Sequence, residues 1–296
     1  MTEIITTLAQ ISGRYDALFC DLWGCLHNGE TAFPAAVAAL QAFRATGGKV
    51  VLLTNSPRPQ SSVVKQLDAI GVPHDAYDMI VSSGDAAQYA LITGAAGRLV
   101  YHIGPDRDGS FFSDFSDDLK DILATQPPIL RVPLAQADGI VCTGLVDDRT
   151  ETPDDYRAVL LHAKNNGLKM LCANPDIIVD VGHQRVFCAG AIAQAYDQMG
   201  GQSLYFGKPH PPIYDLARRR LAAMTGQADL QILCIGDGIA TDVQGAVGEG
   251  LDVVFVTGGL AADQFGADSA NPDKALLDGW LTERQMSPTF SIGYLK

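Results

Sequence analysis

The sequence has no long apolar run, and its charge is not basic. No stretch of about 18 or more apolar residues occurs in the 296 residues, so no membrane-spanning helix is predicted. Lys and Arg number 21 against 34 Asp and Glu, for a net charge of −13. Because so acidic a chain repels nucleic-acid backbones, no nucleic-acid partner is expected. The segment before residue 21 also lacks the pattern of a signal peptide, which favours a cytoplasmic protein.

Cysteine pairs are absent too. The six cysteines include no CxxC pair, and most lie in apolar stretches such as ALFCD and QILCIGD. This pattern favours buried, reduced thiols and gives no sign of a zinc site. What is present is ordinary for a globular enzyme, with 47% hydrophobic and 19% charged residues.

Short apolar runs alternate with amphipathic stretches, which is typical of a parallel sheet with crossover helices. A polar, turn-rich stretch at 105–118 interrupts the pattern. We therefore predict an α/β fold with a Rossmann-like core at 1–86 and 204–296 and an inserted α/β cap domain at 87–203. The predicted strands are 17–21, 49–54, 78–82, 138–142, 168–172, 203–206, 231–236 and 252–257, and the predicted helices are 34–46, 60–70, one from 85, 153–166, 212–223 and 241–249.

Polar side chains follow the first two predicted strands of the core. Asp21 ends one strand, and Thr54-Asn55-Ser56 ends the next. In an open α/β sheet, ligands bind beyond the carboxyl ends of the strands. A carboxylate there can face a substrate, and hydroxyl, amide and backbone N–H groups can hold phosphate oxygens. Each segment alone also fits a simple turn or helix cap.

Two later segments carry charge at similar places. Lys208 lies in GKPHPP after the strand at 203–206, where a lysine can neutralise a phosphate. Asp237 and Asp242 lie in GDGIATD after an apolar strand. Two carboxylates near a phosphate site need a cation, and hard oxygen ligands favour Mg²⁺. The alternatives are an exposed lysine and an aspartate pair that caps a helix.

The order of these four segments resembles the haloacid dehalogenase (HAD) superfamily. The resemblance spans the chain from Asp21 to Gly258, and the insertion between the second and third segments resembles the class II cap arrangement. ANPD (173–176), AGAIAQAY (189–196) and FGKPHPPIYD (206–215) resemble the class IIA, NagD-like or 4-nitrophenylphosphatase-like branch. TNSP departs slightly from the Thr-Asn-Asn usual in that branch.

The resemblance implies a Mg²⁺-dependent phosphohydrolase of small phosphorylated metabolites, of the sugar phosphate or nucleotide monophosphate class. Asp21 would be the nucleophile that forms an aspartyl-phosphate, which water then hydrolyses. Lys208 and Mg²⁺ would supply positive charge. Thr54 and the backbone N–H of Asn55 would bind phosphate oxygens.

The same resemblance assigns the metal ligands. Asp21, Asp237 and the backbone carbonyl of Trp23 would contact Mg²⁺, with Asp242 as a nearby ligand or an orienting group. Asp176 of ANPD is a candidate substrate contact in the cap. Capped relatives often dimerise through this domain, which suggests a homodimer.

Trp23 departs from the family's phosphatase pattern. The usual pattern is Asp-x-Asp-Gly, whose second Asp protonates the leaving oxygen and later activates water, but here Trp23 takes its place. Indole N–H is far too weak an acid for this role. Because acid–base catalysis contributes about 10²–10⁴-fold, the loss should be largest for alkyl phosphates, whose leaving oxygens are basic. Haloacid dehalogenases also carry an aromatic residue here but dispense with the GDxxxTD carboxylates, so retention of Asp237 and Asp242 argues against dehalogenation.

Two histidines are candidates for the missing general acid, and a third is a candidate substrate contact. His27 lies six residues beyond Asp21, and an imidazole with a pKa of about 6.5 can shuttle protons near neutrality. His210 of KPHPP is a second candidate acid, and His183 of the cap is a candidate substrate contact. The alternative for each is a histidine that packs in a loop.

Two other functions stay open. If Trp23 has ended catalysis, the chain is a phosphate-ligand binding protein with weak or no turnover. Phosphonate cleavage through an imine would need a cap lysine; Lys120, Lys164 and Lys169 are available, but their spacing singles out none of them.

Overall fold

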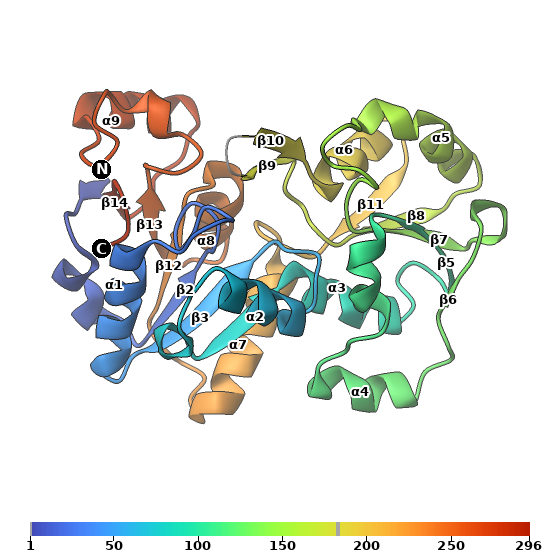
Figure 1. Ribbon diagram of the computed structural model, residues 1–296, viewed down its shortest axis with the longest axis horizontal. Helices are drawn as coiled ribbons and strands as arrows, with labels where there is room; N and C mark the ends of the chain where they lie inside the picture. Colours follow the sequence, from blue (N-terminus) through green and yellow to red (C-terminus); the bar gives the residue numbers. More distant parts are fainter. Residues whose placement is uncertain (1, 182–183) are drawn as a thin grey trace. The chain divides into compact units, whose positions relative to one another are not determined.

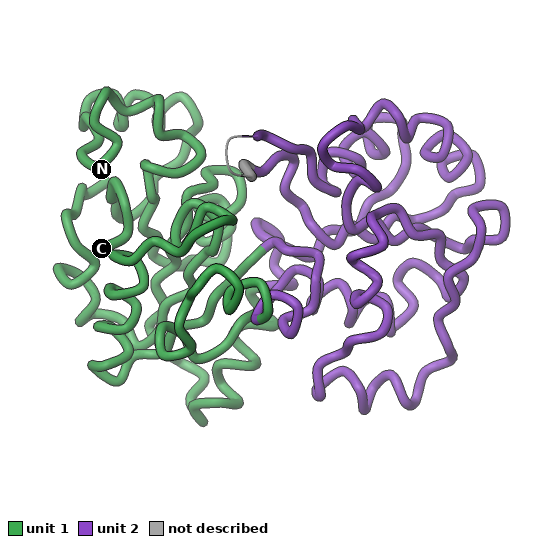
Figure 2. The backbone as a smooth tube through the Cα atoms, in the orientation of Figure 1, with its two compact units in different colours: residues 1–54, 65–81, 214–296 green, residues 55–64, 82–213 purple. Residues whose placement is uncertain are grey.

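The computed structural model describes residues 2–181 and 184–296 and has the predicted alternation of strands and helices (Figure 1). The chain divides into two units (Figure 2). The first consists of residues 1–54, 65–81 and 214–296, and the second of residues 55–64 and 82–213. The second unit therefore contains the predicted insertion and extends beyond both of its bounds. Across the described chain, no helix combines the length and the apolar character that crossing a membrane requires.

A seven-stranded sheet lies at the centre of the first unit, in the order β1-β14-β13-β12-β2-β3-β4. The pairs from β1 to β3 are parallel. Strand β2 is buried at every residue, which explains why its sequence is a continuous apolar run and does not alternate. The strands are β1 (Glu3–Ile4), β2 (Ala17–Cys20), β3 (Lys49–Thr54), β4 (Met79–Ser82), β12 (Ile232–Gly236), β13 (Asp252–Val256) and β14 (Phe290–Ile292).

Helix α1 illustrates how the sequence determines where a helix begins and ends and which face is buried. Pro34 opens it at a position where the missing N–H costs nothing. Ala36, Leu40 and Phe43 are buried along one face, as in an amphipathic helix packed on a core. Gly47 follows with a φ of +96°, which glycine adopts readily. The helices of this unit are α1 (Pro34–Ala45), α8 (Gln244–Gly248) and α9 (Lys274–Glu283), while α2 (Gln60–Ala69) and α7 (Pro211–Thr225) begin in the second unit and end in the first.

The second unit has its own parallel sheet, in the order β11-β8-β7-β5-β6. Its first strand in the chain, β5, lies between β6 and β7, as in doubly wound folds. An antiparallel pair, β9 (Ile178–Val181) with β10 (Gln184–Phe187), stands apart from this sheet. The sheet strands are β5 (Leu99–Ile103), β6 (Leu130–Arg131), β7 (Gly139–Cys142), β8 (Lys169–Cys172) and β11 (Gln202–Tyr205), and the helices are α3 (Ser83–Ile92), α4 (Asp117–Ala124), α5 (Arg157–Asn165) and α6 (Ala189–Gln198).

Most predicted elements are confirmed, but one strand lies in a different sheet from the one expected. The run at 203–206 was expected to resume the core; it forms β11, which pairs with β8 of the second sheet. An apolar run predicts a strand but carries no information about its partner, which explains the error. The elements that were not predicted are strands β1, β5, β6, β9, β10 and β14 and helices α4, α6 and α9.

Candidate active site

Three neighbouring strands of the first unit end on the predicted catalytic residues. Asp21 follows β2, Thr54 ends β3 and Asp237 follows β12. The backbone N–H of Asp21 donates to the carbonyl of Ile235 at 2.8 Å, which continues the ladder between β2 and β12. The side chains are buried, with 8% of Asp21, 2% of Thr54 and 5% of Asp237 exposed. The fold therefore brings together at one sheet edge three residues that lie far apart in the sequence.

Glycines make room for the Asp237 carboxylate. A β-carbon on either Gly24 or Gly259 would collide with this carboxylate. Gly24 also has a φ of +75°, which disfavours any other residue there. The backbone N–H of Leu260 donates to Asp237 Oδ2 at 2.9 Å. Asp237 is thus held in one place by backbone groups on both sides.

Asp242 contacts its own loop. Its Oδ2 accepts the backbone N–H of Gly238 at 3.1 Å, and a β-carbon on Gly236 would overlap its side chain. It lies in a single π-helical turn at Ile239–Val243, a feature common at functional sites. Between the two predicted roles, this geometry favours the orienting group over the direct ligand.

The structure adds Cys25 to the carboxylates of Asp21 and Asp237. One ligand atom of each lies within 4.8 Å of the other two, and all three residues are buried. Burial first, and then the negative charges of Asp237 and Asp21, raise the pKa of the Cys25 thiol well above its usual range. The two buried carboxylates fit a hard divalent cation such as Mg²⁺, which oxygen ligands prefer. Sequence spacing alone could not place Cys25 beside Asp237.

Trp23 packs back onto its own loop. Its indole meets the His27 ring edge-on, with centroids 5.2 Å apart. A β-carbon on Gly29 would collide with the far edge of the indole. The backbone carbonyl of His27 accepts the N–H of Gly24 at 2.9 Å. The indole therefore braces the loop that follows the predicted nucleophile.

His27 does not have the surroundings of the predicted substitute acid. It is fully buried, and burial lowers its pKa to about 4. Its Nδ1 accepts the backbone N–H of Gly29 at 2.9 Å, and among the described residues its Nε2 has no hydrogen-bond partner. The ring is therefore a neutral, packed part of the Trp23 loop.

A substitution of His27 separates the two roles. Asparagine can keep an acceptor for the Gly29 N–H, so we expect His27→Asn to leave phosphate release within about threefold of wild type, whereas loss of a working acid would cost about 10²–10⁴-fold. His27→Leu removes the acceptor and should lower the free energy of unfolding by about 1 kcal/mol or more. Steady-state kinetics and denaturant unfolding measure both effects. A loss of 10²-fold in a folded His27→Asn protein would restore the acid role.

In the second unit, the Asn55 side chain holds the backbone of Lys208. Its Oδ1 accepts the N–H of Lys208 at 2.7 Å, and its Nδ2 donates to the carbonyl of Lys208 at 3.0 Å. The same Nδ2 donates to Asp176 Oδ1 at 2.8 Å. Asn55 and Lys208 are 4% and 3% exposed. One amide therefore joins three of the predicted site residues, a role that the sequence did not indicate.

The Asn55 contacts are tightly packed. A β-carbon on Gly207 would overlap Asn55 Oδ1, Pro175 and Ser83 Oγ. This close approach explains the glycine of GKP. Ser83 Oγ is buried and, within the described ranges, has no hydrogen-bond partner.

Asn55→Asp tests the hydrogen bonds from the Asn55 side chain to Lys208 and Asp176. The change turns a donor into a charged acceptor that faces Asp176 and the Lys208 carbonyl, so we expect the free energy of unfolding to fall by about 3 kcal/mol. Adding Asp176→Asn returns a donor to the pair and should recover about 1–2 kcal/mol of that loss. Denaturant unfolding of the two single variants and the double variant gives the coupling. Strictly additive effects would contradict the direct bond.

His210, the second candidate acid, is engaged in packing. His210 stacks on Tyr205, with ring centroids 4.9 Å apart and planes at 12°, and burial lowers its pKa. Tyr205 in turn donates to Asp197 Oδ2 at 2.6 Å. This arrangement supports the loop that carries Lys208. His183 lies outside the described residues, and the candidate imine lysines Lys120, Lys164 and Lys169 are exposed.

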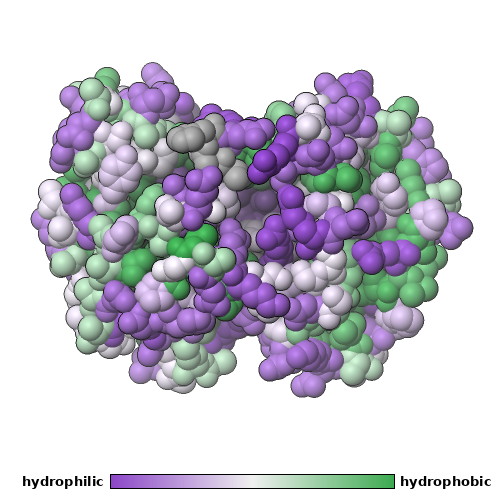
Figure 3. All heavy atoms as spheres, in the orientation of Figure 1, coloured by the Kyte–Doolittle hydropathy of each residue, from purple (hydrophilic) through white to green (hydrophobic). Residues whose placement is uncertain are grey.

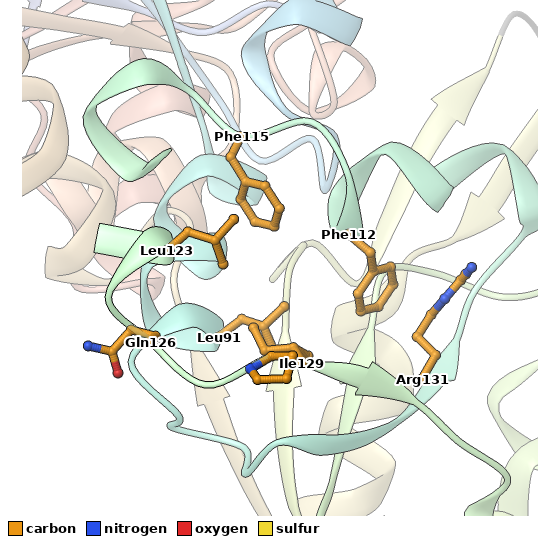
Figure 4. A pocket seen from close by; sticks show the side chains of 8 residues that line it. Leu91, Phe112, Phe115, Leu123, Gln126, Ile129 and Arg131 are labelled. Carbon is orange, nitrogen blue, oxygen red and sulfur yellow. The ribbon is translucent and has the colours of Figure 1, made fainter. Parts of the chain in front are cut away.

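A separate pocket of about 400 Å³ lies within the second unit, among α3, α4 and β6. Apolar side chains surround it, and Arg131 stands at one side (Figure 4). The Arg131 guanidinium lies over the Phe112 ring, 5.1 Å from its centroid. On the face in Figure 3, apolar side chains form patches among mostly hydrophilic ones. The lining residues are Leu91, Phe112, Phe115, Leu123, Gln126, Pro128, Ile129 and Arg131.

Known proteins share both the sequence and the fold. A family model for haloacid dehalogenase-like hydrolases matches residues 18–115, and a HAD-hydrolase-like model matches residues 205–279. The crystal structure of a haloacid dehalogenase-like hydrolase from Brucella suis is 41% identical, with a TM-score of 0.84, over 99% of this chain and 100% of that one.

Two more distant proteins carry functional names. The ribonucleotide monophosphatase NagD of Escherichia coli is 22% identical over 83% of this chain and 88% of its own. A glycerol phosphate phosphatase from Mycobacterium tuberculosis in complex with magnesium is 22% identical, with a TM-score of 0.60, over 87% of this chain and 73% of that one. The four sequence segments, the parallel sheets and these matches agree, and the chain belongs to the haloacid dehalogenase superfamily, in the class IIA branch of capped, NagD-like phosphatases.

Proposed function

We propose that the protein is a Mg²⁺-dependent phosphatase of small phosphorylated metabolites that works through an aspartyl-phosphate on Asp21. One observation carries the proposal most strongly. The buried carboxylates of Asp21 and Asp237 have ligand atoms within 4.8 Å of each other at the ends of adjacent strands. Two carboxylates kept so close are the arrangement expected around a hard cation.

In the proposed reaction, an Asp21 carboxylate oxygen attacks phosphorus and the ester P–O bond breaks. Water then attacks the aspartyl-phosphate and releases inorganic phosphate, which regenerates the carboxylate. Thr54, the backbone N–H of Asn55 and the Lys208 ammonium hold the phosphoryl oxygens. Bound Mg²⁺, with Asp21, Asp237 and the Trp23 carbonyl as proposed ligands, would offset the phosphoryl charge. Asp242 orients the loop of Asp237, and Asn55 and Asp176 position Lys208.

Residue 23 cannot protonate the oxygen of the leaving group. The indole of Trp23 is too weak an acid, and His27 is buried and neutral. A leaving group that is already a stable anion needs no proton, so the protein should favour aryl and acyl phosphates over alkyl phosphates. Trp23 is also the observation that favours a second function, the binding of a phosphate ligand with little turnover.

The names of the relatives support the substrate class. One curated relative is a ribonucleotide monophosphatase and a structural neighbour is a glycerol phosphate phosphatase. We infer a small phosphate monoester of the nucleotide or sugar phosphate class, bound with the help of Asp176 or its neighbours in the second unit.

A substrate panel tests the function. Phosphate release is measured with aryl, acyl, sugar and nucleotide monophosphates, with Mg²⁺ and with EDTA. We expect Mg²⁺-dependent multiple turnover, fastest on the aryl and acyl phosphates. If a Mg²⁺-dependent thermal shift with ligand appears without turnover on any ester, the binding function replaces the phosphatase.

A further inference from the structure

Cys25 lies beside the two carboxylates of the proposed magnesium site. Its Sγ and one carboxylate oxygen each of Asp21 and Asp237 lie within 4.8 Å of one another. Cys25 is only 1% exposed. Two hard oxygen donors and one soft sulfur donor therefore share one small buried volume.

The sulfur changes which cations this volume suits. Mg²⁺ prefers oxygen ligands, whereas Zn²⁺ accepts thiolate and carboxylate together. Zinc binds sulfur at about 2.3 Å and carboxylate oxygen at about 2.1 Å. Three donor atoms within 4.8 Å of one another are therefore close to the span of a single ion. The three donor residues come from two distant segments of the sequence. No local motif such as a CxxC pair therefore indicated this site.

We propose that the site binds thiophilic divalent cations, Zn²⁺ among them, through Cys25 Sγ together with Asp21 and Asp237. The thiol proton passes to solvent as the sulfur–metal bond forms. An ion held in this way occupies the two carboxylates that magnesium needs, so zinc competes with magnesium and inhibits the activity that magnesium supports. This inference rests on the proposed function, since both cations share the same two aspartates.

Cadmium is the probe, because a cadmium–thiolate bond has an ultraviolet charge-transfer band and a cadmium–carboxylate bond has none. The metal-free protein is titrated with Cd²⁺, and the band should saturate with one ion per chain, at a Cd²⁺ concentration that excess Mg²⁺ raises. Cys25→Ser should abolish the band and weaken Cd²⁺ binding, measured by calorimetry, by roughly tenfold or more, while Mg²⁺ affinity stays within about threefold.

Two further variants guard against indirect effects. Cys188→Ser is the matched control, because Cys188 is also a buried free thiol but belongs to the second unit; it should keep the full band. Cys25→Thr provides a second replacement of similar size if serine perturbs the fold. Circular dichroism checks that each variant is folded.

The outcomes separate this inference from the proposed function. A full band in folded Cys25→Ser, or a Cd²⁺ titration that excess Mg²⁺ does not shift at all, overturns the inference. No band in the wild type, with Mg²⁺ still bound and phosphate still released, overturns it and leaves the phosphatase standing. A Cys25-dependent band in a protein that releases no phosphate with Mg²⁺ supports the cation site and contradicts the phosphatase.

Discussion

Replacing Asp21 by asparagine should lower phosphate release by about 10⁴-fold or more, the scale on which loss of a covalent nucleophile acts in other hydrolases. Asparagine has nearly the same shape, so the ladder bond from its N–H to Ile235 and the packing at the end of β2 should survive. The amide oxygen is a much weaker nucleophile than a carboxylate and cannot form the acyl-phosphate. Initial rates with an aryl phosphate and saturating Mg²⁺ measure the effect.

Asp263→Asn is the matched control. Asp263 is exposed in a 3-10 turn of the same unit, so the same change of charge there should leave the rate unaltered. The free energy of unfolding should be measured for both variants, because a folded Asp21→Asn protein is needed for the comparison. If folded Asp21→Asn retained more than about a hundredth of the wild-type rate, the covalent mechanism would be wrong.

The sequence predicts the residues at the strand ends because parallel strands place their carboxyl ends at one edge of the sheet. Asp21, Thr54 and Asp237 follow apolar runs that read clearly as strands, and their relative placement is a consequence of the sheet order. Helix bounds were predictable for a similar local reason, as Pro34 and Gly47 show at the ends of α1.

What depends on contacts between distant segments was not predictable. The position of Asn55 after a predicted strand indicates that its backbone N–H binds phosphate. Its side chain, however, bonds to the backbone of Lys208, 153 residues away. Cys25 reads as an ordinary buried thiol until the loop after β12 is placed beside it. His27 follows the predicted nucleophile Asp21 by six residues and was therefore a candidate acid, yet burial lowers its pKa to about 4. Local patterns contain no information about desolvation or about side-chain partners of this kind.

Trp23→Asp should raise kcat on alkyl phosphates, in contrast to the usual loss on mutating an active site. The change restores a carboxylic acid at the position where phosphatases of the family carry one, and a working general acid contributes about 10²–10⁴-fold. The gain should fall as the leaving group becomes more acidic and should vanish for aryl phosphates. A plot of log kcat against leaving-group pKa measures it, and the slope should be less negative in Trp23→Asp than in wild type.

Trp23→Asn separates the acid from the loss of the indole. Both variants remove the contacts with Gly29 and His27, and each should lose about 1–3 kcal/mol of stability for a large side chain that is only partly buried. Only the aspartate variant regains a proton donor, so the ratio of the two rates on one alkyl phosphate isolates general acid catalysis. Equal rates would mean that a carboxyl at position 23 does not reach the leaving oxygen, and that the indole shapes the loop of a protein whose leaving groups need no proton.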